Sequence, residues 1–497
     1  MAETMPKSDG IIINTFESSE VKAVKGLKQG TCLPGTQIPP VYCIGPLFAN
    51  RGGRAENNVE ERHECLKWLD SQPSRSVVYL GFGSRGVFSK EQIWEIAFGS
   101  SDIEKRAKQI LGSEEGDVVK KRMLELGNMA KIALNNAFIL DFFCYPAVEV
   151  SQSLKILTYF FFTSSASSLT FFLNFPVFDK ITSASFKDLD ITLEIPGLYS
   201  VPANCMIQPM LDRGGSYREF VKLAETLPKA DGIIINTFES LEVNAVKALK
   251  QGTCLLGTSV PPVYCIGPLI ANRGDGAKNN GEPRHECLKW LDSQPSQSVV
   301  YLSFGSRGVF SKEQLWEMAF GLERSGVRFL WVVRAPRREE KGDAFFKPPE
   351  PDLDSFLPEG FMERTKEKGY VVKSWAPQID VLGHESIAGF VSHCGWNSTL
   401  EAIDAGVPIV AWPLYAEQRF NRIVLVDEIG IALPMNESKD LFVSSSEIEK
   451  RVKQIVNSEE RDVIKKRVLD LKDKARDVLK GGSSNVALTT LMESWKR

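Results

Sequence analysis

Residues 375–418 have the sequence WAPQIDVLGHESIAGFVSHCGWNSTLEAIDAGVPIVAWPLYAEQ. The apolar run at 389–393 is typical of a buried strand, and the pattern from Asn397 or Ser398 to Gly406 is typical of a helix. A strand, a tight turn and a helix N-terminus bring backbone N–H groups together, and the helix dipole favours an anion there. The stretch therefore predicts a binding site for a phosphorylated ligand.

The sequence around this stretch alternates between strand-like and helix-like segments from Ser298 onward. This alternation predicts βαβ units and a parallel sheet. Residues 137–144 (AFILDFFC) predict a buried strand in an earlier domain. The polar residues 271–283 predict an interdomain linker, and the charged, proline-rich residues 334–355 predict a mobile surface loop.

Composition excludes several classes of protein. The chain has 497 residues, 43% of them hydrophobic and 25% charged, and a net charge of −3. These values predict a globular protein of more than one domain and give no reason to expect nucleic acid or an anionic membrane as a partner. The N-terminus has no apolar signal region. The nine cysteines form no CxxC pair, which predicts reduced cytoplasmic thiols and no disulfide framework or zinc site.

Residues 156–178 form the most apolar window and are long enough to span a bilayer. Polar residues at 163–168 and Asn174 interrupt the window, and it is flanked by single lysines. A buried strand followed by a buried helix is therefore expected, with no membrane insertion.

The chain contains a partial copy of itself. Residues 2–18 return at 224–240, and the match continues without a gap until 82–99 matches 304–321; residues 100–122 then match 445–467. The copy therefore omits the stretch 375–418, and it indicates a partial gene duplication or a misassembled gene. One long repeat is not a solenoid, which needs three or more units. We expect three parts: residues 1–136 as a partial duplicate (of 223–321 and 445–481), 137–260 as the remainder of an N-terminal domain, and 261–497 as a C-terminal domain.

The 44 residues 375–418 resemble the plant secondary-product glycosyltransferase signature, which is the donor site of UDP-dependent glycosyltransferases of family 1. The resemblance rests on Trp-Ala-Pro-Gln at the start, His-Cys-Gly-Trp-Asn-Ser in the middle and Glu-Gln at the end, and it extends over residues 137–497. It implies an α/β fold of the GT-B type, with two Rossmann-like domains facing a cleft, here with a truncated N-terminal domain preceded by the duplicate. It further implies a cytoplasmic, monomeric plant enzyme that transfers glucose from UDP-glucose to a phenolic or flavonoid hydroxyl, with inversion and without a cofactor or metal.

The resemblance also assigns roles to residues, and each has a plainer alternative. Glu401 would bind the ribose hydroxyls, but Ser398-Thr-Leu-Glu401 also fits a capping box in which Glu401 is structural. His393 would contact the pyrophosphate, although a lone histidine after a strand is usually a core residue. Trp375 would stack on uracil or belong to the core. The implied donor-binding residues are Ser306, Trp375, Ala376, Gln378, His393, Gly395, Trp396, Asn397, Ser398, Glu401, Tyr415, Glu417 and Gln418, with Thr163 as a further sugar contact.

A glycine pattern offers a competing interpretation. GFGSRG at 81–86 fits the G-x-G-x-x-G dinucleotide motif, but its copy at 303–308 is SFGSRG and lacks the first glycine. We therefore reject a dehydrogenase and expect Ser306 to donate to a phosphate.

Catalysis is the incomplete part of the resemblance. In the family, a histidine ahead of a strand aspartate acts as the base, and Asp141 matches that aspartate. The chain has only His63, His285, His384 and His393, and none lies in a strand–loop–helix unit ahead of Asp141. His63 and His285 are repeat partners in a segment expected to be a surface helix. The alternatives are thus a pseudoenzyme that binds the donor, or a non-catalytic interaction protein that uses the duplicate.

Overall fold

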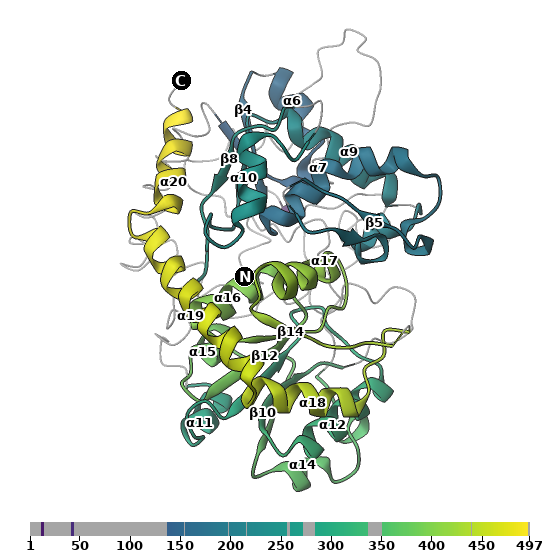
Figure 1. The fold of residues 1–497 in the computed structure, drawn as a ribbon, viewed down its shortest axis with the longest axis vertical. Helices are drawn as coiled ribbons and strands as arrows, with labels where there is room; N and C mark the ends of the chain where they lie inside the picture. Colours follow the sequence, from purple (N-terminus) through teal and green to yellow (C-terminus); the bar gives the residue numbers. More distant parts are fainter. Residues whose placement is uncertain are drawn as a thin grey trace, which may run out of the picture. The chain divides into compact units, whose positions relative to one another are not determined.

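The computed structural model describes the backbone of residues 11–13 and 41–43, and residues 137–495 except 154, 197, 215, 256–258, 272–283, 336–349 and 439. The chain forms two compact units. One contains residues 1–132 and 339–347, and the other contains residues 133–338 and 348–497. In the first unit, β1 (Ile11–Ile13) pairs in parallel with β2 (Val41–Cys43). The elements described below all belong to the second unit (Figure 1).

A six-stranded parallel sheet forms the C-terminal part of the second unit. Its order is β11-β10-β9-β12-β13-β14, so the chain starts at β9, adds two strands on one side and then crosses to the other. This is the order of a doubly wound dinucleotide fold, in which ligands bind where the direction reverses. That point lies between β9 and β12. The strands are β9 (Val299–Ser303), β10 (Arg328–Val333), β11 (Gly369–Lys373), β12 (Ile387–Ser392), β13 (Ile409–Ala411) and β14 (Ala432–Pro434).

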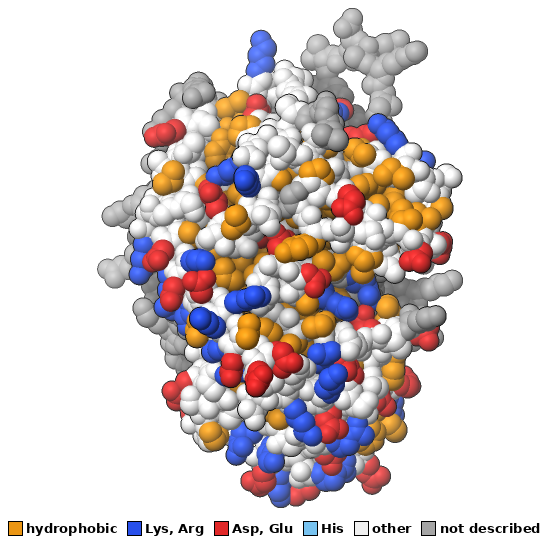
Figure 2. Space-filling view, viewed as in Figure 1, with side chains coloured by type: hydrophobic (Ala, Val, Ile, Leu, Met, Phe, Trp, Pro, Cys, Tyr) orange, Lys and Arg blue, Asp and Glu red, His pale blue; other side chains and the backbone are white. Residues whose placement is uncertain are grey.

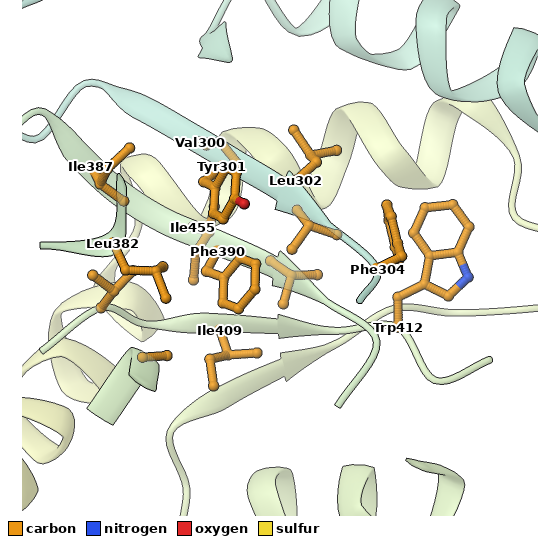
Figure 3. Close-up of a cluster of buried hydrophobic side chains, with 14 of the residues drawn as sticks. Val300, Tyr301, Leu302, Phe304, Leu382, Ile387, Phe390, Ile409, Trp412 and Ile455 are labelled. Carbon is orange, nitrogen blue, oxygen red and sulfur yellow. The ribbon is translucent and has the colours of Figure 1, made fainter. Parts of the chain in front are cut away.

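Helices alternate with these strands, which confirms the predicted βαβ pattern. Every residue of β9 and β12 is buried, as expected for strands covered on both faces. Tyr301 stacks on Phe390 with 5.2 Å between ring centroids, and Trp412 meets Phe304 edge-on at 5.4 Å (Figure 3). The helices are α11 (Glu286–Asp292), α12 (Lys312–Ser325), α13 (Leu353–Phe356), α14 (Phe361–Thr365), α15 (Gln378–Leu382), α16 (Trp396–Ala405), α17 (Gln418–Ile423), the π-helix η7 (Val424–Glu428), α18 (Ser445–Val456), α19 (Glu459–Leu479) and α20 (Ser483–Ser494).

A smaller parallel sheet has the order β3-β4-β7-β8. Its last strand, Val263–Cys265, lies beyond residue 260, the predicted end of the first domain, so the chain leaves this sheet a few residues later. The helix α20 also returns to it, since Leu491 packs with Tyr159 and Tyr264. The remaining elements are β3 (Ala137–Asp141), η2 (Phe142–Cys144), α6 (Ala147–Ser153), β4 (Leu157–Phe162), α7 (Ala166–Ile181), η3 (Phe186–Asp188), β5 (Thr192–Leu193), β6 (Val201–Pro202), η4 (Ala203–Cys205), α8 (Gln208–Leu211), α9 (Tyr217–Thr226), η5 (Leu227–Lys229), β7 (Gly232–Ile235) and α10 (Val243–Gln251).

The apolar window 156–178 forms the strand β4 and most of the helix α7, as predicted. Ser165 caps α7 by accepting a hydrogen bond from the Ser168 backbone N–H at 2.9 Å. Nearly all side chains in the first two-thirds of α7 are buried, so the apolar residues of this window fill the core of the smaller sheet. Among the described residues, no helix combines the length and the apolar character needed to cross a membrane.

The prediction that residues 137–144 form a buried strand is only half correct. The strand β3 forms, but it is an edge strand in which only Ala137 is buried, while Phe138 and Leu140 are partly buried. Ile139 is 48% exposed and Asp141 is exposed as well. The apolar sequence could not reveal this, because burial of a strand depends on neighbours that lie elsewhere in the chain.

The two strands described in the first unit repeat a strand pair of the second. Ile11 is paired with Val41 in the first unit, and Ile233 is paired with Val263 in the second. Adding the repeat offset of 222 to the first two residue numbers gives the second two. The duplicate therefore keeps the local pairing of its parent. The copied strand at 76–82, the motif at 81–86, His63 and most of the loop 334–355 lie outside the described residues.

Charges of both signs are interspersed on the face that Figure 2 draws. Surface ion pairs among the described residues, such as Lys187 with Asp212 and Arg364 with Glu323, contribute little stability.

Candidate functional site

The N-terminus of α16 is open toward solvent and lacks a side-chain cap. The chain leaves β12 through Cys394, whose φ of +65° makes the sharp turn, and Gly395 occupies the N-cap position without a side-chain hydrogen bond. The first backbone N–H groups of a helix have no partner within the helix, so they converge on the space in front of Gly395. Together with the helix dipole, they make this end of α16 a suitable site for an anion.

The capping-box alternative for Glu401 is wrong. The helix begins at Trp396, three residues earlier than a cap at Ser398 requires, so Ser398 lies inside the first turn. Its hydroxyl accepts a hydrogen bond from the Gln378 side-chain amide at 2.9 Å, and the same amide donates to Glu401 at 2.7 Å. Gln378 begins α15, so two helices contribute to this polar cluster.

Glu401 is largely withdrawn from water, and this burial raises the pKa of its carboxyl group, while the hydrogen bond from Gln378 acts in the opposite direction. Within the part of the chain that the structure describes, one of its two oxygens accepts this hydrogen bond, which leaves the other able to accept hydroxyl donors of a ligand. A carboxylate that is mostly buried, with one oxygen already hydrogen-bonded and the other able to accept, is well suited to bind two neighbouring hydroxyl groups of a sugar.

His393 lies directly behind the open helix end and is 6% exposed. A Cβ atom added at Gly305 would lie 2.6 Å from His393 Nε2, and one added at Gly395 would lie 2.4 Å away, so both glycines are needed for the imidazole to fit. Gly305 also has a φ of +71°, which favours glycine. Burial lowers the pKa of His393 to about 4, so the ring is neutral near pH 7.

The Nδ1 atom of His393 is buried and has no hydrogen-bond partner within the described residues. An unsatisfied buried polar atom costs free energy, on the order of 1–3 kcal/mol. Such an atom behind an anion site is expected to gain a partner, directly or through water, when a ligand binds. The core-histidine alternative predicts a satisfied ring, and the structure does not show one.

Trp375 presents its ring to solvent and is 61% exposed. Ser374, with a φ of +62°, turns the chain outward at the end of β11, and the ring meets that of His285 edge-on at 5.9 Å. This excludes the alternative that Trp375 is a core residue. Its neighbour Ala376 is buried and therefore offers a ligand only backbone atoms.

The loop between β13 and α17 forms the opposite side of the site. Gln418 is buried, and its side-chain oxygen accepts from the backbone N–H groups of Leu414 and Tyr415 at 2.9 Å each. Glu417 is partly exposed and accepts from the Ser164 hydroxyl at 3.3 Å. Thr163, which precedes Ser164, is exposed, so the end of β4 lies beside the Glu417 carboxylate.

Of two other predicted site residues, Ser306 is exposed and Trp396 is buried. Ser306 is exposed in the turn after β9, one residue beyond the glycine that touches His393. Trp396 is 3% exposed, and its indole N–H already donates to the backbone oxygen of Asn236 at 2.8 Å. Its side chain is therefore not available to a ligand, and Trp396 can contribute only its backbone N–H.

Asn236 is a residue that we did not predict. It follows β7 directly, is 4% exposed, and its side-chain amide lies 3.5 Å from the side-chain oxygen of Asn397. The signal was present in the sequence, because a polar residue directly after the apolar strand at 232–235 lies at the carboxyl edge of a parallel sheet, where ligands bind.

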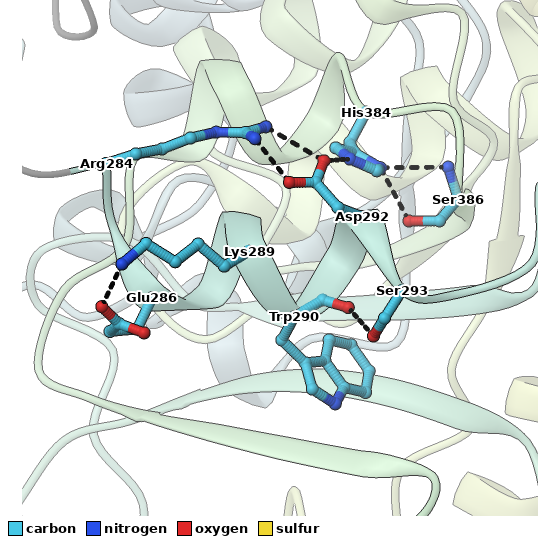
Figure 4. A network of polar contacts seen from close by, with 8 residues as sticks. All are labelled: Arg284, Glu286, Lys289, Trp290, Asp292, Ser293, His384 and Ser386. Atoms are coloured by element: carbon cyan, nitrogen blue, oxygen red, sulfur yellow. Dashed lines mark hydrogen bonds and ion pairs between the residues drawn. The ribbon is translucent and has the colours of Figure 1, made fainter.

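The three described histidines do not contact Asp141. His285 caps α11 instead of lying within a surface helix, since its Nδ1 accepts from the Cys287 backbone. His384 lies between Ser386, at 2.9 Å, and Asp292, at 3.1 Å, and Arg284 also binds Asp292 (Figure 4). The Asp141 carboxylate accepts from the backbone N–H of Phe143 at 2.9 Å and caps the short helix η2.

Comparison with known proteins agrees with this geometry. Residues 266–477 match the family model described as UDP-glucoronosyl and UDP-glucosyl transferase. The chain is 50% identical to UDP-glycosyltransferase 88B1 of Stevia rebaudiana over 361 residues (72% of this chain, 75% of the relative), and 46% identical to the anthocyanidin 5,3-O-glucosyltransferase of a Rosa hybrid cultivar over 365 residues (73% and 75%). A solved structure of a UGT transferase from Siraitia grosvenorii in complex with UDP is 34% identical, with a TM-score of 0.66 over 75% of this chain and 81% of that chain.

Proposed function

The chain belongs to the family of UDP-glucoronosyl and UDP-glucosyl transferases, and on that basis we propose that it transfers glucose from UDP-glucose to a hydroxyl of a small phenolic acceptor, such as a flavonoid. One observation carries this proposal. The uncapped N-terminus of α16 lies directly before the buried, unpartnered imidazole of His393, and the Gln378–Glu401 pair extends from the same helix turn. Its fold is the predicted α/β GT-B fold, as in the solved relatives.

The donor is proposed to lie along the carboxyl edge of the larger sheet. Its diphosphate occupies the space before α16, with donors from Ser306, Asn397 and the helix backbone. Its ribose hydroxyls bind the free oxygen of Glu401, and its uracil stacks on the exposed face of Trp375. The glucose moiety then lies toward the loop after β13.

The sugar contacts proposed for that loop are Tyr415, Glu417, Gln418 and Thr163. The Glu417 carboxylate is partly exposed beside Ser164, so it has capacity left for sugar hydroxyls. Gln418 uses its oxygen to shape the loop and can offer the sugar only its amide N–H groups. Tyr415 lies 6.2 Å from His393, measured between ring centroids, which joins the sugar and phosphate sides.

The proposed reaction is a single displacement with inversion. The acceptor oxygen attacks the anomeric carbon, the bond from that carbon to the β-phosphate oxygen breaks, and UDP leaves with the bonding electrons. The negative charge that develops on UDP is stabilised by the N-terminus of α16 and by His393, whose pKa rises next to a phosphate dianion. The proton of the acceptor hydroxyl passes to a base and finally to solvent water. No described histidine contacts Asp141, which is the carboxylate that we propose for orienting that base.

The relatives do not support the pseudoenzyme alternative, because the two relatives described above are named as glycosyltransferases. The decisive experiment incubates the purified full chain with UDP-glucose and a panel of flavonoids, and measures UDP release and the mass of the product. We expect a monoglucoside that forms only when both substrates are present. Binding of UDP in calorimetry without any glucoside across the panel would contradict the proposal.

We further propose that the enzyme is a cytoplasmic monomer without a cofactor. Its three parts were predicted as residues 1–136, 137–260 and 261–497, and we propose the same parts with the second boundary moved beyond β8. Light scattering after size-exclusion chromatography measures the mass, and a dimer at micromolar concentration would refute the monomer. Limited proteolysis that cuts first near residue 136 is the result expected for a separate first part.

A further inference from the structure

Asn236 connects the end of β7 with two segments that bear on the donor site. Its backbone oxygen accepts from the Trp396 indole at 2.8 Å, and its side-chain oxygen accepts from the Leu269 backbone N–H at 2.8 Å. Its side-chain nitrogen faces the side-chain oxygen of Asn397 at 3.5 Å. Asn236 thus contacts the first turn of α16 twice and the segment that leaves β8 once.

The space around Asn236 permits little movement. A Cβ atom added at Gly267 would lie 2.7 Å from the side-chain oxygen of Asn236, so the segment after β8 is packed tightly against the amide. The backbone oxygen of Gly267 in turn accepts from the Ser484 hydroxyl of α20 at 2.6 Å. The amide is therefore enclosed and cannot reorient at low cost.

The polarity of these contacts can be traced from one unambiguous donor. A backbone N–H can only donate, so the atom of Asn236 that faces Leu269 must be its oxygen. The NH2 group of Asn236 must then point the other way, toward Asn397. A pair of NH2 groups would repel, so Asn397 turns its oxygen to Asn236 and its own NH2 group away from it.

We propose that Asn236 is a positioning residue that fixes the amide of Asn397 with its NH2 group toward the donor phosphates. Asn397 is exposed in the first turn of α16, where the phosphates are proposed to lie, so this inference rests on the proposed function. The reverse orientation would direct a carbonyl oxygen at a phosphate oxygen. Hydrogen bonds to charged groups contribute about 1.5–3 kcal/mol, so the orientation of one amide changes affinity about ten-fold or more.

The test replaces Asn236 by aspartate, which keeps the shape and still accepts from Leu269. The second carboxylate oxygen then faces Asn397 and draws the NH2 group of Asn397 toward itself. We expect Asn236→Asp to weaken UDP binding about ten-fold in calorimetry, and Asn236→Ala to weaken it a few-fold, because alanine no longer holds the Asn397 amide.

A double-mutant cycle with Asn397→Ala separates orientation from simple repulsion by the new charge. Repulsion of the phosphates by the introduced carboxylate persists when Asn397 is absent, whereas the orientation effect disappears. We expect most of the Asn236→Asp and Asn236→Ala losses to vanish in the Asn397→Ala background. A loss that is unchanged in that background would overturn the inference, as would Asn397→Ala binding UDP like the wild type.

A matched control is Asn174→Asp. Asn174 is also a buried asparagine, and its NH2 group donates to the backbone oxygens of Thr170 and Cys254, far along α7 from the site. The Asn174→Asp variant should have a lower melting temperature. Any change in its UDP affinity should be the same in the wild-type and Asn397→Ala backgrounds. A similar Asn397-dependent loss in this control would overturn the specific role of Asn236.

Three further outcomes are distinguishable. If neither Asn236 variant folds, Asn397→Asp tests the same amide by changing only an exposed side chain, and UDP affinity equal to the wild type would overturn the inference. If the wild-type chain binds no UDP at all, the proposed function itself fails. If the wild type binds UDP and both Asn236 variants bind it equally well, only the role of Asn236 fails.

Discussion

Acidification is expected to destabilise the free protein through His393. In the folded state the pKa of His393 is lowered to about 4 by burial, whereas an unfolded histidine has its ordinary value of 6.5. Between these values the unfolded chain binds more protons at this position than the folded chain does. Stability at this site therefore falls as the pH falls through that window, and it is unaffected above the unfolded value.

The size of the effect follows from the two pKa values. Between about pH 8 and about pH 5, the unfolded histidine becomes mostly protonated while the folded one stays mostly neutral. The linkage relation then gives a loss of about 2 kcal/mol by pH 5, which rises to about 3 kcal/mol at still lower pH. Bound UDP should reduce this loss, because a phosphate next to His393 favours the protonated ring.

The assay compares the wild type with His393→Gln by denaturant unfolding across this range. Other groups titrate as well, such as Glu428, whose pKa burial raises to about 7, but they are present in both proteins and cancel in the difference. We expect the wild type to lose about 2 kcal/mol more than the variant between pH 8 and 5. Equal losses in the two proteins would refute a buried neutral imidazole. An unchanged difference when UDP is saturating would instead refute the position of the phosphate next to His393.

Three substitutions test the rest of the site. Gly305→Ala should reduce UDP affinity about ten-fold or more in calorimetry, because the new methyl group displaces the imidazole and the φ of +71° is unfavourable for alanine. Gly326→Ala is the control: it has a similar φ of +64°, but its Cβ would meet only the end of the Lys368 side chain, at 3.7 Å. It should share the cost in melting temperature and leave UDP affinity unchanged. Trp375→Ala should weaken UDP binding by about 1–3 kcal/mol, because the stacking of the indole on uracil is lost. The free energy of unfolding should change by less than about 0.5 kcal/mol, since the side chain is exposed. Trp316→Ala replaces another exposed tryptophan and should leave UDP affinity unchanged in the same titration. Gln378→Ala should raise the KM for UDP-glucose about ten-fold with a smaller effect on kcat, and a normal KM in steady-state assays would contradict the Gln378–Glu401 arrangement.

The sequence predicted the parallel sheet and the strand–turn–helix unit at residues 389–406. These features depend on local patterns, namely apolar strands of a few residues, a turn, and a helix that ends at Gly406 in the left-handed conformation. The burial of residues 156–178 was also predictable, because a long apolar run in a chain without a membrane-spanning pattern must enter a core. The predicted roles in donor and sugar binding remain proposals for these residues.

Other properties of the site depended on contacts between distant segments. Ser398 and Glu401 fit a capping box by spacing, but the helix starts at Trp396 and both side chains bind Gln378 from another helix. A local pattern cannot show which of two partners a carboxylate chooses, because the choice depends on distances set by packing.

Exposure was likewise decided by neighbours. Asp141 lies in an apolar sequence, yet it is exposed because β3 is the edge strand of its sheet, and Trp375 is exposed because Ser374 turns the chain outward. By itself, the sequence thus determined which segments form strands and helices and that a helix N-terminus suited to an anion follows the fourth strand of the larger sheet. Only the tertiary structure decided which side chains remain free for a ligand, because hydrogen-bond partners such as Asn236 and Trp396 lie 160 residues apart in the chain and meet only when the strands pack.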